Sequence, residues 1–266
     1  MTLAIWREQL LTHALVGRPL SPPVPGSRRG LAAARFELLR AGIGLLALPG
    51  ANVTAENAFL SKIDHLVYAT PDLAAGVARL EVLLGVRAVP GGQHPAWGTR
   101  NALIALGDRT YLEVLGPDPE QPKPSQPRPL GIDELEAPRL VTWAAKGTDL
   151  DRIVEEARRR GVDLGAVQSG SRRRPDGVLL SWRLTEFSMS NAGGIVPFFI
   201  DWGETPHPAA SLSKSCSLID LRAEHPDPES VGAILSALGL DLPVTAVATP
   251  ALVATIRSPR GTVTLR

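Results

Sequence analysis

The chain has 266 residues, of which 44% are hydrophobic, and its formal net charge is +1. It is long enough to bury a sizeable core, as one large or two modest domains. The balanced charge argues against a general role in binding nucleic acid or an acidic membrane. The single cysteine, Cys216, excludes an internal disulfide and fits a reducing compartment, so we expect a cytoplasmic protein.

Residues 1–60 differ in composition from the rest of the chain. They contain six arginines against three acidic residues, and their longest apolar stretch is too short to cross a bilayer. We favour a poorly defined N-terminal extension. The alternative is an organellar transit peptide, because such peptides are rich in arginine and poor in acidic residues, and the protein would then be organellar.

A loosely matching run of eight residues occurs three times at nearly even spacing. Each run ends in an aspartate, and these aspartates are 77 (149 − 72) and 78 (227 − 149) residues apart. Each run predicts a short apolar strand that ends at a turn, where the aspartate caps a helix. A regular period indicates one structural unit used repeatedly. The runs are His65-Leu-Val-Tyr-Ala-Thr-Pro-Asp72, Thr142-Trp-Ala-Ala-Lys-Gly-Thr-Asp149 and Asp220-Leu-Arg-Ala-Glu-His-Pro-Asp227.

The elements after each aspartate follow one order. Apolar residues at helical spacing predict helices over residues 73–84, 150–157 and 231–238, ended by Gly85, Gly161 and Gly239. Strands are then expected at 86–89, 99–106 and 109–115, at 163–167, 179–184 and 195–202, and at 244–248, 251–257 and 262–265.

This order predicts an α+β protein built from tandem βαβββ modules. Residues 61–210 should form a paired-module domain, with module 1 at 61–117, a Pro-rich linker at 118–138 and module 2 at 139–210. Residues 211–266 should form a third βαβββ-like repeat. Two paired modules form half-open curved sheets with the helices outside, and their concave face is a natural site for a small molecule. Such folds often form homodimers.

Two polar residues lie in the apolar strands that open and close module 1. His65 is near the start of the first strand, and Glu113 lies among apolar residues of the last. A carboxylate there is costly to bury unless it is paired or bound to a cation. Imidazole and carboxylate together are common ligands of zinc, nickel, manganese and iron. We therefore expect His65 and Glu113 to bind one divalent metal ion.

Further candidates surround these two. Asp201 occupies the matching closing strand of module 2, and we expect Asp201 and His94 to be catalytic. The glycine-flanked segment 91–101 should place polar side chains at the rim of the pocket. Arg183 is a candidate for holding an anionic ligand or, alternatively, a member of an ion pair. The run from Arg172 to Arg174 is expected to be a solvated loop, and the alternative is a site for a carboxylate or phosphate. His207, which follows the Asp201 strand, is a weaker candidate for the mouth of the pocket. The predicted ligand-binding residues are Trp97, Thr99, Asn101, Tyr111 and Arg183.

Several of these segments resemble a known superfamily over about residues 63–202. The opening Ile63-Asp-His-Leu-Val-Tyr-Ala-Thr-Pro-Asp-Leu73 is similar to that of vicinal oxygen chelate proteins. His94-Pro-Ala-Trp-Gly-Thr-Arg-Asn101 and Tyr111-Leu-Glu113 resemble more narrowly its glyoxalase-like domain branch. The superfamily pairs βαβββ modules around a metal site, and it includes glyoxalase I, extradiol dioxygenases, fosfomycin-resistance proteins and metal-free drug-binding proteins.

The resemblance implies roles for individual residues. His65 matches the metal-binding histidine of the opening strand, Glu113 the metal-binding glutamate, and Asp201 the acid of the second module. Thr142 departs from the pattern, because metal-dependent members commonly have histidine or glutamate there. The site then lacks one ligand unless His94 supplies it.

Two functions follow from these observations, and a weaker third option is a degenerate scaffold whose third repeat occupies the site or builds a dimer contact. The first, which we favour, is a metal-assisted lyase, isomerase or dioxygenase that acts on a small oxygenated substrate in the concave pocket. The second is a non-catalytic protein of the same fold that binds or sequesters a small molecule. Both imply a small-molecule ligand and neither implies a nucleic acid or a membrane as partner.

Overall fold

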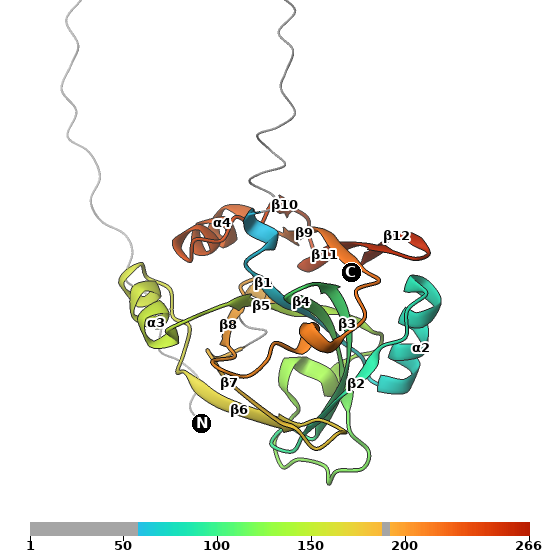
Figure 1. Ribbon diagram of the computed structural model, residues 1–266. Coiled ribbons are helices and arrows are strands. Elements are labelled where there is room, and N and C mark those ends of the chain that lie inside the picture. Colours follow the sequence, from blue (N-terminus) through green and yellow to red (C-terminus); the bar gives the residue numbers. More distant parts are fainter. Residues whose placement is uncertain (1–57, 188–191) are drawn as a thin grey trace, which may run out of the picture. The chain divides into compact units, whose positions relative to one another are not determined.

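The computed structural model describes residues 58–187 and 192–266, and the expectations for residues 1–57 lie outside this part of the chain. The described part combines helices and strands in the expected order, so the α+β class is confirmed (Figure 1). No helix among the described residues is long and apolar enough to cross a membrane.

Three groups of elements follow one another along the chain. The first is β1 (Ile63–Ala69), α2 (Leu73–Leu84), β2 (Val89–His94), β3 (Thr99–Gly107) and β4 (Thr110–Pro117). The second is β5 (Arg139–Lys146), α3 (Leu150–Arg159), β6 (Gln168–Arg173), β7 (Leu179–Leu184) and β8 (Phe198–Asp201). The third is β9 (Ser217–His225), α4 (Pro228–Ala237), β10 (Val244–Ala246), β11 (Ala251–Ser258) and β12 (Gly261–Leu265). Short 3₁₀ helices span Pro129–Glu134, Ala192–Gly194 and Pro208–Ser211.

The three repeated aspartates cap α2, α3 and α4 as predicted. Each side chain accepts a hydrogen bond from a backbone N–H three residues later: Asp72 from Ala75 at 3.1 Å, Asp149 from Arg152 at 3.4 Å and Asp227 from Ser230 at 3.0 Å. These bonds satisfy donors that the first helical turn leaves free. The sequence period therefore marks the starts of the three helices.

The first two groups close into one barrel, with the strand order β1-β4-β3-β2-β6-β7-β8-β5. The two modules meet along the antiparallel pair β1–β5, and on the other side through Gln93 of β2 and Arg173 of β6. The sequence suggested half-open walls. The contact between β2 and β6 is the second seam between the modules, and it closes the two sheets into a barrel. It forms because both strands extend to later residues than expected.

Strands β2 and β6 begin later than the strands predicted at 86–89 and 163–167. The sequence pattern did not predict these strands because both contain glycine, which is rare in strand interiors and has no side chain to show an alternating pattern. A β-carbon on Gly170 would lie 2.5 Å from the indole Nε1 of Trp182, and one on Gly91 would collide with Asn101. The glycines make room for larger side chains from neighbouring strands.

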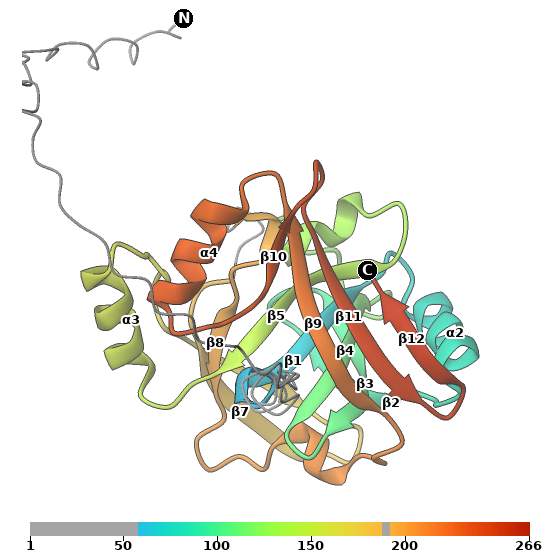
Figure 2. The same ribbon diagram turned by 90° about the horizontal axis from the view of Figure 1, so that it is seen from above.

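The third group forms a separate sheet, in the order β10-β9-β11-β12. This sheet lies against the outer face of the barrel, across β5, β1, β4 and β3 (Figure 2). Apolar residues that point out of the barrel share one core with apolar residues of the third sheet, and they include Leu66, Tyr68, Ile104 and Leu112 with Leu221, Ala223, Leu252 and Ala254. The barrel interior contains a second apolar cluster, and the candidate site lies there.

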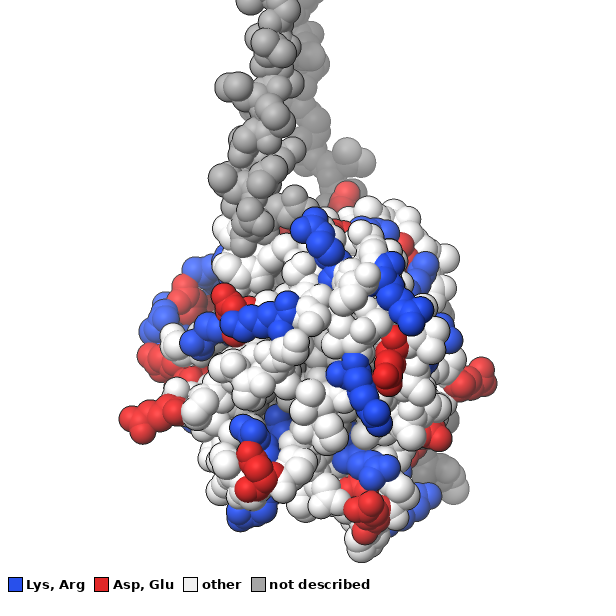
Figure 3. All heavy atoms as spheres, turned by 45° about the vertical axis from the view of Figure 1, so that its right-hand side comes forward, with Lys and Arg blue, Asp and Glu red and all other residues white. Residues whose placement is uncertain are grey.

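Acidic and basic side chains are interspersed on the face of the molecule drawn in Figure 3. No extended area of a single charge is visible on this face.

Candidate functional site

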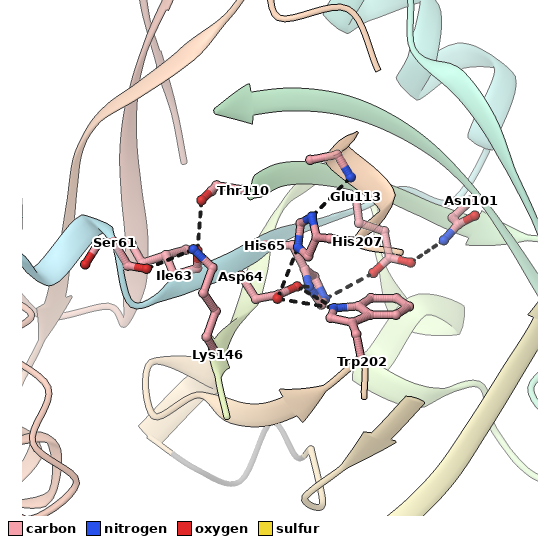
Figure 4. Close-up of polar contacts among 11 residues, drawn as sticks. Ser61, Ile63, Asp64, His65, Asn101, Thr110, Glu113, Lys146, Trp202 and His207 are labelled. Carbon is pink, nitrogen blue, oxygen red and sulfur yellow. Dashed lines mark hydrogen bonds and ion pairs between the residues drawn. The ribbon is translucent and has the colours of Figure 1, made fainter. Parts of the chain in front are cut away.

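The site begins at strand β1, where the pairing with β5 is irregular. The register shifts between Ile63 and His65, and both Asp64 and His65 are buried, with exposed fractions of 1% and 3%. A regular strand would send these neighbours to opposite faces. The irregularity lets both side chains join one polar cluster inside the protein (Figure 4).

Asp64 is the centre of this cluster. Its carboxylate accepts a hydrogen bond from Nδ1 of His65 at 2.8 Å, from Nε2 of His207 at 3.2 Å and from the indole Nε1 of Trp202 at 3.2 Å. Burial by itself would raise the pKa of Asp64, but the bonds from His207 and His65 outweigh it and hold that pKa well below its usual value. Asp64 is therefore a buried, ionised carboxylate with three donors.

Glu113 faces His65 from the neighbouring strand β4. The carboxylate oxygen Oε2 lies 3.8 Å from Nε2 of His65, and Oε1 accepts a hydrogen bond from Nδ2 of Asn101 at 2.5 Å. Tyr111 stacks on the imidazole of His65 with ring centroids 4.7 Å apart. Burial, followed by the nearby charges of Asp64 and Glu113, raises the pKa of Tyr111 well above its usual value, so its phenol is neutral.

His94 lies at the end of β2 and is buried. Its Nδ1 is 3.1 Å from the hydroxyl of Thr99. Burial lowers the pKa of His94 to about 4, an effect that the carboxylate of Glu113 opposes and the charge of Arg172 reinforces. The ring is therefore neutral near pH 7.

Arg172 enters the barrel from β6 and has an exposed fraction of 4%. Its guanidinium donates to the carbonyl oxygen of Gly91. Burial lowers the pKa of Arg172, but an arginine stays charged in proteins. The expectation that Arg172 belongs to a solvated loop is wrong, because β6 extends to Arg173 and forms part of the barrel wall.

These side chains surround a pocket with a cavity of about 50 Å³, enough for a few water molecules or a group such as a carboxylate. Six of the predicted site residues line it: His65, His94, Trp97, Asn101, Tyr111 and Glu113. Aromatic and aliphatic side chains complete the wall, among them Trp182, Leu184, Phe187, Phe198, Ile200 and Trp202. Among the described residues that line it, Arg172 has the one permanent positive charge.

Three predicted site residues do not line this pocket. In β8 the side chains alternate, so that Phe198 and Ile200 line the pocket and Asp201 does not; its carboxylate accepts from the N–H of Gly203 at 2.8 Å. Arg183 binds Asp151 of α3 at 2.9 Å on the outside of the barrel. Thr99 is buried behind His94. The expectation that Asp201 and Arg183 act in the pocket is therefore corrected.

Sequence reasoning missed Asp64 and Trp202, and it placed Arg172 and His207 only among the weaker candidates for the site. Asp64 was overlooked because strict strand alternation places it on the face opposite His65. Arg172 was assigned to a loop, and Trp202 and His207 lie outside the repeated motif. A usable signal was the pair Asp64-His65 itself, since an ionisable residue in an apolar strand needs a buried partner.

The donor set of the pocket does not fit a resident divalent ion. Among the residues that the structure describes, no three histidine, cysteine, aspartate or glutamate side chains are placed to hold a metal. His65 and Glu113 provide two ligands. On the second module, β5 offers Thr142 and β8 offers apolar side chains, while the cation Arg172 lies in the same pocket. A metal site normally needs at least one more protein ligand.

Comparison with known proteins gives one sequence family and a set of similar folds. The family model of the glyoxalase-like domain matches residues 63–239. The comparison with curated proteins gives no match. A solved hypothetical protein from Staphylococcus aureus is 15% identical, with 76% of this chain and 83% of that chain covered and a TM-score of 0.54. Methylmalonyl-CoA epimerase from Mycobacterium tuberculosis is 20% identical, with 57% and 94% covered and a TM-score of 0.38.

The first structural likeness supports the fold, and neither likeness defines an activity. The family match carries more weight, because it covers more than half of the chain and includes both modules of the barrel. This chain therefore belongs to the glyoxalase-like domain family.

Proposed function

We propose that the barrel pocket binds a small oxygenated acid and catalyses proton transfer beside its carbonyl group, as an isomerase or lyase. The observation that supports this most directly is the contact of the partly exposed Glu113 with the buried His65 and Asn101, next to the buried Asp64 and the cation of Arg172. A carboxylate base, an oriented imidazole and a neighbouring positive charge are the groups that proton transfer on an anionic substrate requires.

Arg172 is the group that would bind the acid. A guanidinium forms charge-assisted hydrogen bonds to a carboxylate, and these are stronger in a site that excludes water. The walls of Trp97, Phe187 and Phe198 exclude water and match an apolar substrate chain. The small cavity favours a substrate of few atoms, with its carboxylate toward Arg172.

Glu113 would act as the base. Asn101 fixes one of its oxygens, so that the other, Oε2, faces the pocket and His65. A proton taken from carbon by Glu113 can pass to Nε2 of His65, where the carboxylate of Asp64 stabilises the imidazolium. The neutral phenol of Tyr111 can donate to the enolate oxygen as its charge develops. His94 stays neutral and supports the wall.

Deuterium exchange tests this proposal. The protein is incubated in D₂O with 2-oxobutanoate, and the loss of the proton signal at carbon 3 is followed by NMR. Glu113→Gln should reduce the exchange rate by roughly 10²–10⁴-fold, since the base is lost. Arg183→Gln, outside the pocket, is the matched control and should exchange at the wild-type rate. Equal rates for wild type and Glu113→Gln would contradict the role of Glu113.

Non-catalytic binding is the second candidate, and the mainly apolar and aromatic walls around one cation support it. The same samples separate the two functions. Binding of 2-oxobutanoate by titration calorimetry without any exchange would favour the binding protein. Arg172→Gln should weaken that binding in either case, because it removes the charge that pairs with the carboxylate.

The metal-assisted form of the reaction, expected from the sequence, would use His65 and Glu113 as ligands. Because two donors without a third make a weak site, we expect the purified protein to contain no stoichiometric zinc, nickel, manganese or iron. Elemental analysis of wild type and of a His65→Ala, Glu113→Ala double variant tests this. A full equivalent of metal that disappears in the double variant would show that the ion belongs to this site. A cytoplasmic location and a homodimer stay predictions.

A further inference from the structure

Behind the pocket, a series of hydrogen bonds runs from a backbone amide to His65. It starts at His207, which follows β8 and precedes the 3₁₀ helix Pro208–Ser211. The N–H of Ala209 donates to Nδ1 of His207 at 3.2 Å. A ring nitrogen that accepts a hydrogen bond carries no proton, so the proton of this imidazole is on Nε2.

The proton on Nε2 of His207 points to Asp64, whose Oδ2 is 3.2 Å away. The indole N–H of Trp202 donates to the same carboxylate, at 3.2 Å from Oδ2 and 3.3 Å from Oδ1. An ionised carboxylate can only accept hydrogen bonds. Each of its partners must therefore be a donor, and two of these partners come from the second module, more than 130 residues from Asp64 in sequence.

The third partner of Asp64 is His65, with Nδ1 at 2.8 Å from Oδ1. Since this oxygen accepts, Nδ1 of His65 must carry a proton. The opposite tautomer would place a lone pair of Nδ1 against a lone pair of Oδ1 at hydrogen-bond distance. In the neutral ring, Nε2 of His65 is then unprotonated, and this is the nitrogen that faces Glu113 (Figure 4).

We infer that His207 and Trp202 are positioning residues that act through Asp64 to set the tautomer of His65. They hold the carboxylate so that Oδ1 faces Nδ1 of His65, and Nε2 of His65 is kept as the proton acceptor of the pocket. This inference deepens the proposed function, in which Nε2 receives the proton from Glu113. The tautomer itself is a property of the protein without ligand, so it can be measured separately.

Nitrogen NMR of the histidine side chains in the ligand-free, ¹⁵N-labelled full-length protein tests the inference. At a pH where the ring is neutral, wild-type His65 should show a protonated Nδ1 and an unprotonated Nε2. In the His207→Phe, Trp202→Phe double variant, both donors to Asp64 are lost, and the Nε2-protonated form of His65 should increase. His207→Gln keeps an amide N–H for Asp64 and should retain the wild-type spectrum.

His225→Phe, outside the pocket lining, is the matched histidine control and should leave the resonances of His65 unchanged. Trp202→Phe alone is the second variant if the double variant does not fold, and it should shift the tautomer in the same direction. A wild-type His65 with its proton on Nε2 would overturn the inference. So would an unchanged tautomer in a folded variant that lacks both donors.

The deuterium exchange of 2-oxobutanoate separates this inference from the proposed function. If both hold, His207→Phe should slow exchange by roughly 10-fold to 100-fold, as is usual when the group that orients a histidine is lost, and His207→Gln should restore it. If His65 carries its proton on Nδ1 but the protein exchanges no deuterium into 2-oxobutanoate, the proposed proton transfer is refuted and the positioning role still holds.

Discussion

Asp64 is the residue on which the arrangement of the site depends. It is almost fully buried and accepts from two imidazoles and one indole, so its charge is balanced by directed hydrogen bonds. Removing one member of a buried polar network leaves the others without partners, and this costs more than the net value of a single bond.

Asp64→Asn is therefore expected to destabilise the protein by about 1–3 kcal/mol, because an amide cannot accept from three donors and its NH₂ group opposes one of them. Urea unfolding at pH 7 measures the free energy of unfolding. Asp151→Asn, at an exposed aspartate of α3, is the control and should stay close to wild type. A wild-type free energy for Asp64→Asn would show that the network contributes little.

His94 makes stability depend on pH. Its pKa is about 4 in the folded protein and 6.5 in the unfolded chain, so the unfolded state binds a proton more readily as pH falls. The contribution of the neutral, buried ring is complete above pH 6.5 and is lost as pH falls toward 4. At 1.36 kcal/mol per pKa unit, the loss is roughly 3 kcal/mol.

His94→Gln should remove this part of the pH dependence, because glutamine does not titrate. Unfolding free energies of both proteins at several pH values between 4 and 7 give the comparison. Parallel curves for wild type and His94→Gln would mean that His94 titrates normally in the folded state.

At the scale of elements, β2 and β6 decide the shape of the barrel. They bring His94 and Arg172 to the pocket, and their one residue pair closes the second seam between the modules. Both strands contain glycines over which side chains of adjacent strands lie. Where a glycine backbone packs closely under a large ring, there is no room for an added β-carbon.

Gly170→Ala should accordingly destabilise the protein by about 1–3 kcal/mol, since the new β-carbon would meet the indole of Trp182. Gly232→Ala is the matched control with the opposite sign. It lies in α4 with open space around it, and alanine should stabilise the helix by roughly 0.5–1 kcal/mol. Thermal unfolding of both variants tests the pair, and a neutral Gly170→Ala would mean that β6 moves aside at no cost.

At the scale of the whole described molecule, the third sheet covers the outer wall of the barrel. Leu66, Tyr68 and Leu112 on the barrel share a core with Leu221 and Leu252 of the third sheet. The C-terminal carbonyl of Arg266 also accepts from the N–H of Leu140 in β5 at 3.2 Å. Elements that share a core are expected to unfold together.

We therefore expect the barrel and the third sheet to unfold in one transition. Four of the five tryptophans belong to the barrel modules, so in a Trp6→Phe variant tryptophan fluorescence reports on the barrel: Trp97, Trp143, Trp182 and Trp202. Hydrogen exchange of the amides in β9 and β11 reports on the third sheet. Both should give the same free energy of unfolding, and a lower value for β9 and β11 would show that the third sheet opens first.

The sequence by itself determined the fold class, the starts of the three helices and six of the seventeen residues that line the pocket. Local patterns carry that information: an aspartate at each N-cap, apolar residues at helical spacing, and polar residues such as His65 and Glu113 in apolar strands. The tertiary structure alone decided which side chains share a cavity. A bulge at β1 brings in Asp64, glycines admit β2 and β6 to the wall, and alternation in β8 turns Asp201 away from the pocket. Each depends on contacts between residues far apart in the chain, which no local period records.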